Sequence, residues 1–196
     1  MSKMPQQKPG QSRQDYGTPI ALIRAIEGRW GKLTIDLAAT AENAKCPKFI
    51  TPEEDSLKAD WDKKIGAKGR GWLNMEFGDI DPWVEKAGVC SRNLILITPA
   101  SIGSEWYAEH IEGIPETGDW AGWKAKTVGL RPRICFEGVH TLRKPDAAGI
   151  RRPVCEGRVP ECKGCATYPK DCCLLLFGHQ FRFEPILQTW RWDANG

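Results

Sequence analysis

Short apolar segments alternate with helix-forming segments along this chain of 196 residues, and this alternation most constrains its fold. Residues 33–37 alternate apolar and polar side chains, and residues 93–98 (NLILIT) are almost wholly apolar, two patterns typical of β-strands. Thr18-Pro19 and Asp81-Pro82 each pair a capping residue with the proline that favours a first helical turn. Strands that alternate with helices predict an α/β sheet.

Polar residues stand at the ends of two predicted strands. Asp36 lies near the carboxyl end of the strand at 33–37, and Asn74 ends a short apolar strand at 71–74. Ligands of open α/β sheets bind outside the carboxyl ends of the strands. The sequence therefore predicts a ligand site that contains both side chains.

The second half of the chain has fewer recognisable elements. Ser104 is expected to cap a helix that runs to about His110, and residues 133–136 and 172–177 are predicted as the last two strands. The residues between these strands, 137–171, lack apolar periodicity and are predicted to form an insert that is rich in basic residues and cysteine.

The amino-terminal residues 1–14 are polar and are expected to form a disordered tail, which leaves 15–196 as one domain. No apolar run approaches the roughly 18 residues that cross a bilayer. The expectation is a cytoplasmic protein without a membrane partner.

Positive charge is concentrated in the second half. Between Lys124 and Lys170 there are eleven Lys and Arg residues against four Asp and Glu residues, although the whole chain has a net charge of only +3. A basic segment on a mildly acidic body indicates a surface that binds a polyanion, with a merely solvated basic loop as the alternative. The polyanion contacts predicted from this segment are Arg143, Lys144, Arg151 and Arg152.

Three cysteines of the insert and Cys172, which directly follows it, have a spacing that suits a metal. Cys155, Cys162, Cys165 and Cys172 surround a CxxC core in a segment with little apolar content. Four thiolates can close a tetrahedral zinc site and order such a segment. Reduced free thiols and disulfides are the alternatives, and disulfides are disfavoured in a chain without a secretion signal.

Several short motifs occur in a characteristic order. They are Tyr16-x-Thr18-Pro19; Leu33-x-Ile35-Asp36-Leu37-Ala38-Ala39 with Asn43-Ala44-Lys45-Cys46; Asp55-Ser56-Leu57 with Trp61; and Trp72-Leu73-Asn74-x-x-Phe77 with Trp83-x-x-Lys86-Ala87. The ordered set resembles the phage-type DNA adenine-N6 methyltransferases over roughly residues 14–110.

This resemblance implies a class I methyltransferase fold, an α/β sheet with helices on both faces, and S-adenosylmethionine as cofactor. It implies that Asp36 holds the methionine end of the cofactor and that Asp55 contacts its adenine. Tyr16, Thr18 and Pro19 match the family's amino-terminal cofactor motif. Ala38 begins the turn Ala38-Ala39-Thr40, which replaces a glycine-rich turn.

The catalytic tetrapeptide of this family is normally Asn/Asp-Pro-Pro-Tyr/Phe, and here it is Asn74-Met75-Glu76-Phe77. The resemblance implies that Asn74 accepts a hydrogen bond from the adenine amine and that Phe77 stacks on a base flipped out of the duplex. Both prolines, which restrict φ, are absent. Glu76 adds a carboxylate that can accept a bond from the amine or repel the DNA backbone.

The predicted function is adenine-N6 methylation of DNA, with activity reduced by the altered tetrapeptide. Two alternatives stay open. One is a catalytically inactive relative that binds cofactor or DNA, and the other is a methyltransferase that acts on another base or on RNA.

Overall fold

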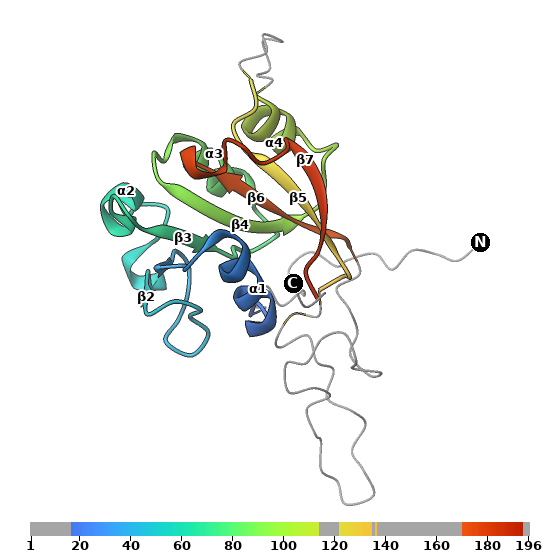
Figure 1. Cartoon of the computed structure of the whole chain (residues 1–196). Helices are drawn as coiled ribbons and strands as arrows, with labels where there is room; N and C mark the ends of the chain where they lie inside the picture. The colour runs from blue at the N-terminus through green and yellow to red at the C-terminus, as the bar shows by residue number, and fades with distance from the viewer. Residues whose placement is uncertain (1–16, 114–121, 135, 137–169, 194–196) are drawn as a thin grey trace, which may run out of the picture.

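The computed structural model describes residues 17–113, 122–134, 136 and 170–193. Within these residues, seven strands form one sheet in the order β2-β1-β3-β4-β6-β5-β7 (Figure 1). The strands are β1 (Ile35–Asp36), β2 (Lys48–Phe49), β3 (Arg70–Leu73), β4 (Asn93–Pro99), β5 (Lys126–Arg131), β6 (Cys172–Phe177) and β7 (Leu187–Arg191).

The helices are α1 (Ile20–Trp30), α2 (Trp61–Ile65), α3 (Asp81–Val89) and α4 (Glu105–Tyr107), which continues into a π-helical turn at Ala108–Glu112. Short 3-10 turns occupy Pro52–Glu54 and His179–Phe181. Among the described helices, none has the length and apolar character needed to cross a membrane.

The sheet divides into a parallel and a mixed part. Strand β1 pairs in parallel with β2 on one side and β3 on the other, and β3 pairs in parallel with β4. Strand β6 runs antiparallel to both β4 and β5, while β7 pairs in parallel with β5. Because the chain leaves β1 toward β2 and later returns on its opposite side at β3, the carboxyl ends of β1 and β3 form a topological switch point.

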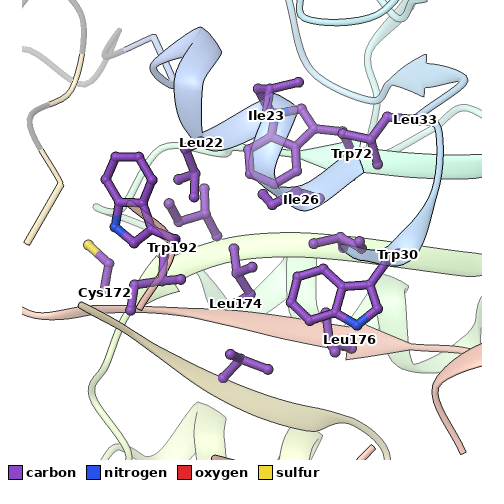
Figure 2. Packing of buried hydrophobic residues seen from close by; sticks show 14 of the residues in the cluster. Leu22, Ile23, Ile26, Trp30, Leu33, Trp72, Cys172, Leu174, Leu176 and Trp192 are labelled. Atoms are coloured by element: carbon purple, nitrogen blue, oxygen red, sulfur yellow. The ribbon is translucent and has the colours of Figure 1, made fainter. Parts of the chain in front are cut away.

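Helices cover both faces of the sheet, which confirms the predicted α/β architecture (Figure 1). Helix α1 packs on one face through Leu22, Ile23 and Ile26, and this layer is called the α1-side core (Figure 2). Helices α2, α3 and α4 pack on the opposite face, in the α3-side core, which contains Trp61, Val84, Tyr107, Leu94, Leu96 and Leu175.

All six residues of β6 (CCLLLF) are buried. Cys172, Leu174 and Leu176 belong to the α1-side core, whereas Cys173, Leu175 and Phe177 belong to the α3-side core. A strand covered on both faces needs apolar side chains at every position. This explains why the segment 172–177 is recognisable in the sequence as a continuous apolar run.

One strand prediction in the second half was wrong, and another strand there was not predicted. The strand predicted at 133–136 instead lies at Lys126–Arg131, where Val128 and Leu130 face the α1-side core. It ends before Pro132, which has no N–H to donate to a sheet. Strand β7 was not predicted because it is an edge strand whose residues alternate between exposed and half-buried, so it has no continuous apolar signal.

The structure corrects two of the three predicted helix caps, Thr18 and Asp81. The Pro19 carbonyl, not the Thr18 side chain, accepts the first helical N–H groups, those of Leu22 and Ile23. Asp81 is the first residue of α3, and its carboxylate binds His110 at 2.9 Å. Ser104 is the N-cap residue of α4, as predicted, but its carbonyl accepts the N–H groups of Tyr107 and Ala108 while its hydroxyl donates to the Ser101 carbonyl at 2.7 Å.

Candidate functional site

A cavity of about 350 Å³ opens at the carboxyl ends of β1 and β3. Its volume lies within the range of sites that bind small molecules, and it occupies the switch point of the sheet. Its lining residues are Gly17, Thr18, Asp36, Ala38, Ala39, Thr40, Asn43, Lys45, Ile50, Thr51, Pro52, Asp55, Ser56, Trp72, Asn74, Met75, Glu76 and Trp83.

Asp36 places a buried carboxylate at the cavity. It is the last residue of β1, its exposed fraction is 3%, and its two oxygens accept the backbone N–H groups of Ala38 (3.3 Å) and Lys45 (3.0 Å). Burial raises the pKa of Asp36 to about 6, although the two N–H groups and the charge of Lys45 oppose the rise. A desolvated carboxylate in this position is suited to binding a cation or a hydrogen-bond donor.

Two buried polar side chains that line the cavity have no hydrogen-bond partner among the described residues. They are the hydroxyl of Thr18 and the indole N–H of Trp72. Leaving such a group unsatisfied costs about 1–3 kcal/mol. The hydroxyl can donate or accept and the indole can only donate, so both remain available to a ligand.

The segment after β2 holds Asp55 in an uncommon backbone conformation, with a φ of 54°. The Asp55 carboxylate pairs with Lys58 at 2.6 Å, which lowers the pKa of Asp55, and it accepts the N–H of Leu57. The next residue, Ser56, is buried and accepts the indole N–H of Trp61. These contacts fix the position of Asp55 at the cavity wall.

Side-chain packing holds the tetrapeptide that follows β3. Met75 is 3% exposed and belongs to the α3-side core, whereas Glu76 is exposed. Phe77 is half-buried, touches both cores and packs edge-on against Phe136 with ring centroids 5.9 Å apart. The loop therefore has two anchors, Met75 and Phe77, on either side of Glu76.

The structure brings together six of the predicted site residues, Thr18, Asp36, Ala38, Asp55, Asn74 and Glu76. Pro19 and Phe77 are not among the residues that line the cavity. Tyr16, Arg143, Lys144, Arg151 and Arg152 lie outside the described residues, so their roles stay predictions.

Sequence reasoning did not assign Trp72 or Lys45 to the site. The body of Trp72 is buried beneath α1 beside Ile23 and Leu33 (Figure 2). Its position two residues before Asn74 was the available signal, but only the fold shows that the indole N–H lacks a partner.

Of the four cysteines predicted to bind zinc, only Cys172 lies within the described residues. It begins β6, is 1% exposed and lies beside Trp192 in the α1-side core (Figure 2). Burial raises the pKa of the Cys172 thiol, which disfavours the thiolate that binds metal. Among the described residues no group of three or more His, Cys, Asp or Glu side chains could hold a metal, so the structure does not support the zinc site.

Comparison with known proteins adds a family to this geometry. Residues 6–118 match the family model described as DNA N-6-adenine-methyltransferase (Dam), a range that contains every residue lining the cavity. The chain is 33% identical over 104 residues to the "DNA N-6-adenine-methyltransferase" of Escherichia phage T1, a match that covers 52% of this chain and 42% of the phage protein. It is 28% identical over 81 residues to the "Putative methyltransferase YfdM" of Escherichia coli (strain K12), covering 39% of this chain and 85% of that protein. The chain thus spans less than half the length of the phage T1 relative.

Proposed function

Because the chain belongs to the DNA N-6-adenine-methyltransferase family, we propose that it transfers a methyl group from S-adenosylmethionine to N6 of adenine in DNA. One observation carries this proposal. The cavity at the switch point is lined by Asp36 and Asn74 and also by Thr18 and Trp72, two buried polar groups without a hydrogen-bond partner in the described part of the chain.

The cavity residues suit S-adenosylmethionine, the cofactor of this family. Three carboxylates line the cavity, Asp36, Asp55 and Glu76, against one ammonium group, Lys45. Lys58 neutralises Asp55 from outside the lining, and the remaining excess of negative charge favours a cationic ligand. When bound, the cofactor supplies an electrophilic methyl group on a positively charged sulfur. The Thr18 hydroxyl and the Trp72 indole N–H are available to form hydrogen bonds with it.

Asn74 is the residue proposed to act on the adenine. The exocyclic amine is a weak nucleophile because its lone pair is delocalised into the ring. The side-chain carbonyl of Asn74 and the backbone carbonyl of Met75 would accept its two N–H bonds and hold the nitrogen in position. Positioned dipoles of this kind lower the barrier without a general base.

The altered tetrapeptide is expected to reduce the rate without disordering the loop. Burial of Met75 and the contact between Phe77 and Phe136 restrain the segment that two prolines restrain elsewhere in the family. Among the described residues, no comparable contact offsets the replacement of the second proline by Glu76. Its exposed carboxylate adds negative charge at the cavity rim, where it would repel the phosphates of approaching DNA. Restoring the family's proline at position 75 would not be a clean test of the loop, because Met75→Pro would also remove a buried side chain.

The test is mass spectrometry of nucleosides after incubating the protein with DNA and cofactor that carries an isotopically labelled methyl group. The expected product is labelled N6-methyldeoxyadenosine. Cofactor binding detected by calorimetry with no labelled nucleoside would instead identify an inactive relative. A labelled base other than adenine would identify a different acceptor, the outcome that Glu76 favours.

The cofactor assignment has a separate readout in thermal stability. S-adenosylmethionine should raise the melting temperature of the wild-type protein. Asp36→Ala should abolish this rise, and Asp79→Ala, at an exposed carboxylate outside the cavity, should preserve it. An equal rise in both variants would contradict the assignment of Asp36.

Zinc bound by Cys155, Cys162, Cys165 and Cys172 stays a prediction, separate from this function. If the cysteines bind one zinc ion, metal analysis of the purified protein should return about one equivalent. A metal-free protein after mild purification would favour reduced thiols.

A further inference from the structure

Four basic side chains lie at the carboxyl edge of β5 and β7, away from the cavity itself. They are Arg131, Arg133, Lys170 and Arg191, here called the basic edge, and all are exposed. We propose that the basic edge binds phosphates of the DNA duplex whose adenine enters the cavity. The proposal rests on the proposed function for the identity of the polyanion, and it assigns described residues as contacts in addition to those predicted in the insert.

The register of the sheet places two of these cations next to each other. Arg131 and Arg191 are directly paired positions of the parallel strands β5 and β7. Like charges at paired positions repel and destabilise a sheet. Such a pair is tolerated where an anion neutralises it, and a DNA backbone supplies anions in a row.

The carboxylates nearby neutralise only part of this charge. Arg133 pairs with Asp171 at 2.7 Å, and Arg191 pairs with Asp193 at 3.2 Å. Arg131 and Lys170 make no ion pair within the described part of the chain. Two of the four cations of the basic edge are therefore paired with carboxylates. The other two, Arg131 and Lys170, have no ion-pair partner in the described residues and are available to bind phosphate.

The basic edge and the cavity share one edge of the sheet. Strands β3, β4, β5 and β7 all run in the same direction, since β6 is antiparallel to both β4 and β5. Lys170 lies at this edge too, because Cys172 at the start of β6 pairs with Pro99 at the end of β4.

The spacing also suits a duplex. With neighbouring strands about 4.8 Å apart, β5 lies about 14 Å and β7 about 19 Å from β3, which carries Asn74. A duplex has one charge per roughly 1.7 Å of its axis, so this length carries on the order of ten phosphates. DNA with a base in the cavity can therefore reach the basic edge without bending.

The opposite edge of the sheet provides a matched control. Lys124 and Lys126 belong to the same basic segment of the sequence, but they lie at the start of β5, and Lys126 pairs with Leu176 near the end of β6. The fold thus places these two lysines a full strand length from the edge where the cavity opens. They should not contact DNA that occupies the cavity.

The experiment compares Arg131→Gln/Lys170→Gln with Lys124→Gln/Lys126→Gln, two double variants with the same change in net charge and no broken ion pair. Fluorescence anisotropy measures the affinity of each for a labelled 20-base-pair duplex between about 50 and 200 mM salt. The slope of log affinity against log salt should become shallower by about 1.8 in the first variant, because each lost phosphate contact contributes about 0.9. It should be unchanged in the second.

Equal slopes in the two double variants, or a wild-type protein that does not bind the duplex, would overturn the proposal. Cofactor affinity and melting temperature should match the wild type in both variants, which separates DNA contact from damage to the fold. The two proposals can also fail separately. Labelled methyladenine with equal slopes refutes the basic edge alone, whereas a shallower slope without any methylated base refutes only the proposed catalysis.

Discussion

The two halves of the sheet differ in how their residues are used. Strands β1 and β2 are two residues long, and every residue that lines the cavity precedes residue 84. Strands β5, β6 and β7 are five or six residues long and contribute no side chain to the cavity lining. The family match at residues 6–118 ends before β5. The cavity is therefore built from the β2, β1 and β3 side of the sheet, whereas β5 and β6 contribute buried residues to the cores without lining it.

A physical reason connects strand length with this division. Because β1 and β2 are short, the loops that follow them begin at the switch point, where their polar side chains can face a ligand. This arrangement lowers the stability of the fold, because it buries polar groups such as Thr18 and Asp36 without fully replacing their hydrogen bonds to water. Strand β6, with both faces covered, supplies apolar burial that offsets this cost.

The largest expected effect tests how much the burial of β6 contributes to stability. Leu174→Ala removes a fully buried side chain from β6 and should lower the free energy of unfolding by about 2–5 kcal/mol. Leu187→Ala, at a position 59% exposed on β7, is the control and should change it by less than about 0.5 kcal/mol. Urea denaturation measures both. Similar losses in the two variants would show that β6 has no special role in stability.

The next largest effect concerns a residue of the cavity and should change the reaction rate much more than the stability. Asn74→Ala removes one positioned hydrogen-bond acceptor and should lower the single-turnover rate of adenine methylation by about 10²–10³. Its free energy of unfolding should stay within about 0.5 kcal/mol of the wild type. Asp79→Ala in the same loop is the control. A rate that is unchanged by Asn74→Ala would remove this residue from the mechanism.

A third expectation follows from the buried carboxylate and depends on pH. Burial raises the pKa of Asp36 from 3.8 to about 6, so the folded protein binds this proton more tightly than the unfolded chain does. The free energy of unfolding should therefore decrease as pH rises from about 4 to about 6, and the loss should persist above that range. In Asp36→Asn this contribution is absent.

The wild type should thus lose up to about 3 kcal/mol relative to Asp36→Asn between pH 4 and pH 8, since each pKa unit corresponds to about 1.4 kcal/mol. Denaturant titrations of both proteins without cofactor, at several pH values, give this difference. Asp79→Asn is the matched control at an exposed carboxylate. Parallel stability curves for the wild type and Asp36→Asn would contradict the raised pKa.

The smallest effect concerns the charge at the rim of the cavity. Glu76 is exposed, so Glu76→Gln should leave stability unchanged and tighten DNA binding roughly 2- to 5-fold at low salt, as expected for one exposed charge. The gain should vanish at high salt because of screening. Glu85→Gln on α3 controls for net charge. Weaker binding by Glu76→Gln would mean that the carboxylate accepts a hydrogen bond from the substrate.

Much of the architecture could be predicted because local sequence patterns reflect it. The alternation at residues 33–37 and the apolar run at 93–98 predicted β1 and β4, and the short apolar segment at 71–74 predicted β3. The carboxyl ends of β1 and β3 form the site. The segment 172–177 was correct for the same reason, since burial on both faces demands apolar residues throughout. Strand β7 and the position of β5 could not be predicted, because an edge strand and a strand containing Gly129 lack a strong local signal.

By itself the sequence determined which segments can be strands or helices and which polar residues stand at strand ends, because these properties depend on neighbours a few residues apart. Only the tertiary structure decided which groups lack partners and which charges share an edge. In the tertiary structure the Thr18 hydroxyl does not cap α1 as expected, and Met75 is buried in the core. The fold also separated one basic segment into two opposite edges of the sheet. Burial and proximity of this kind arise from residues far apart in the chain, which no local pattern encodes.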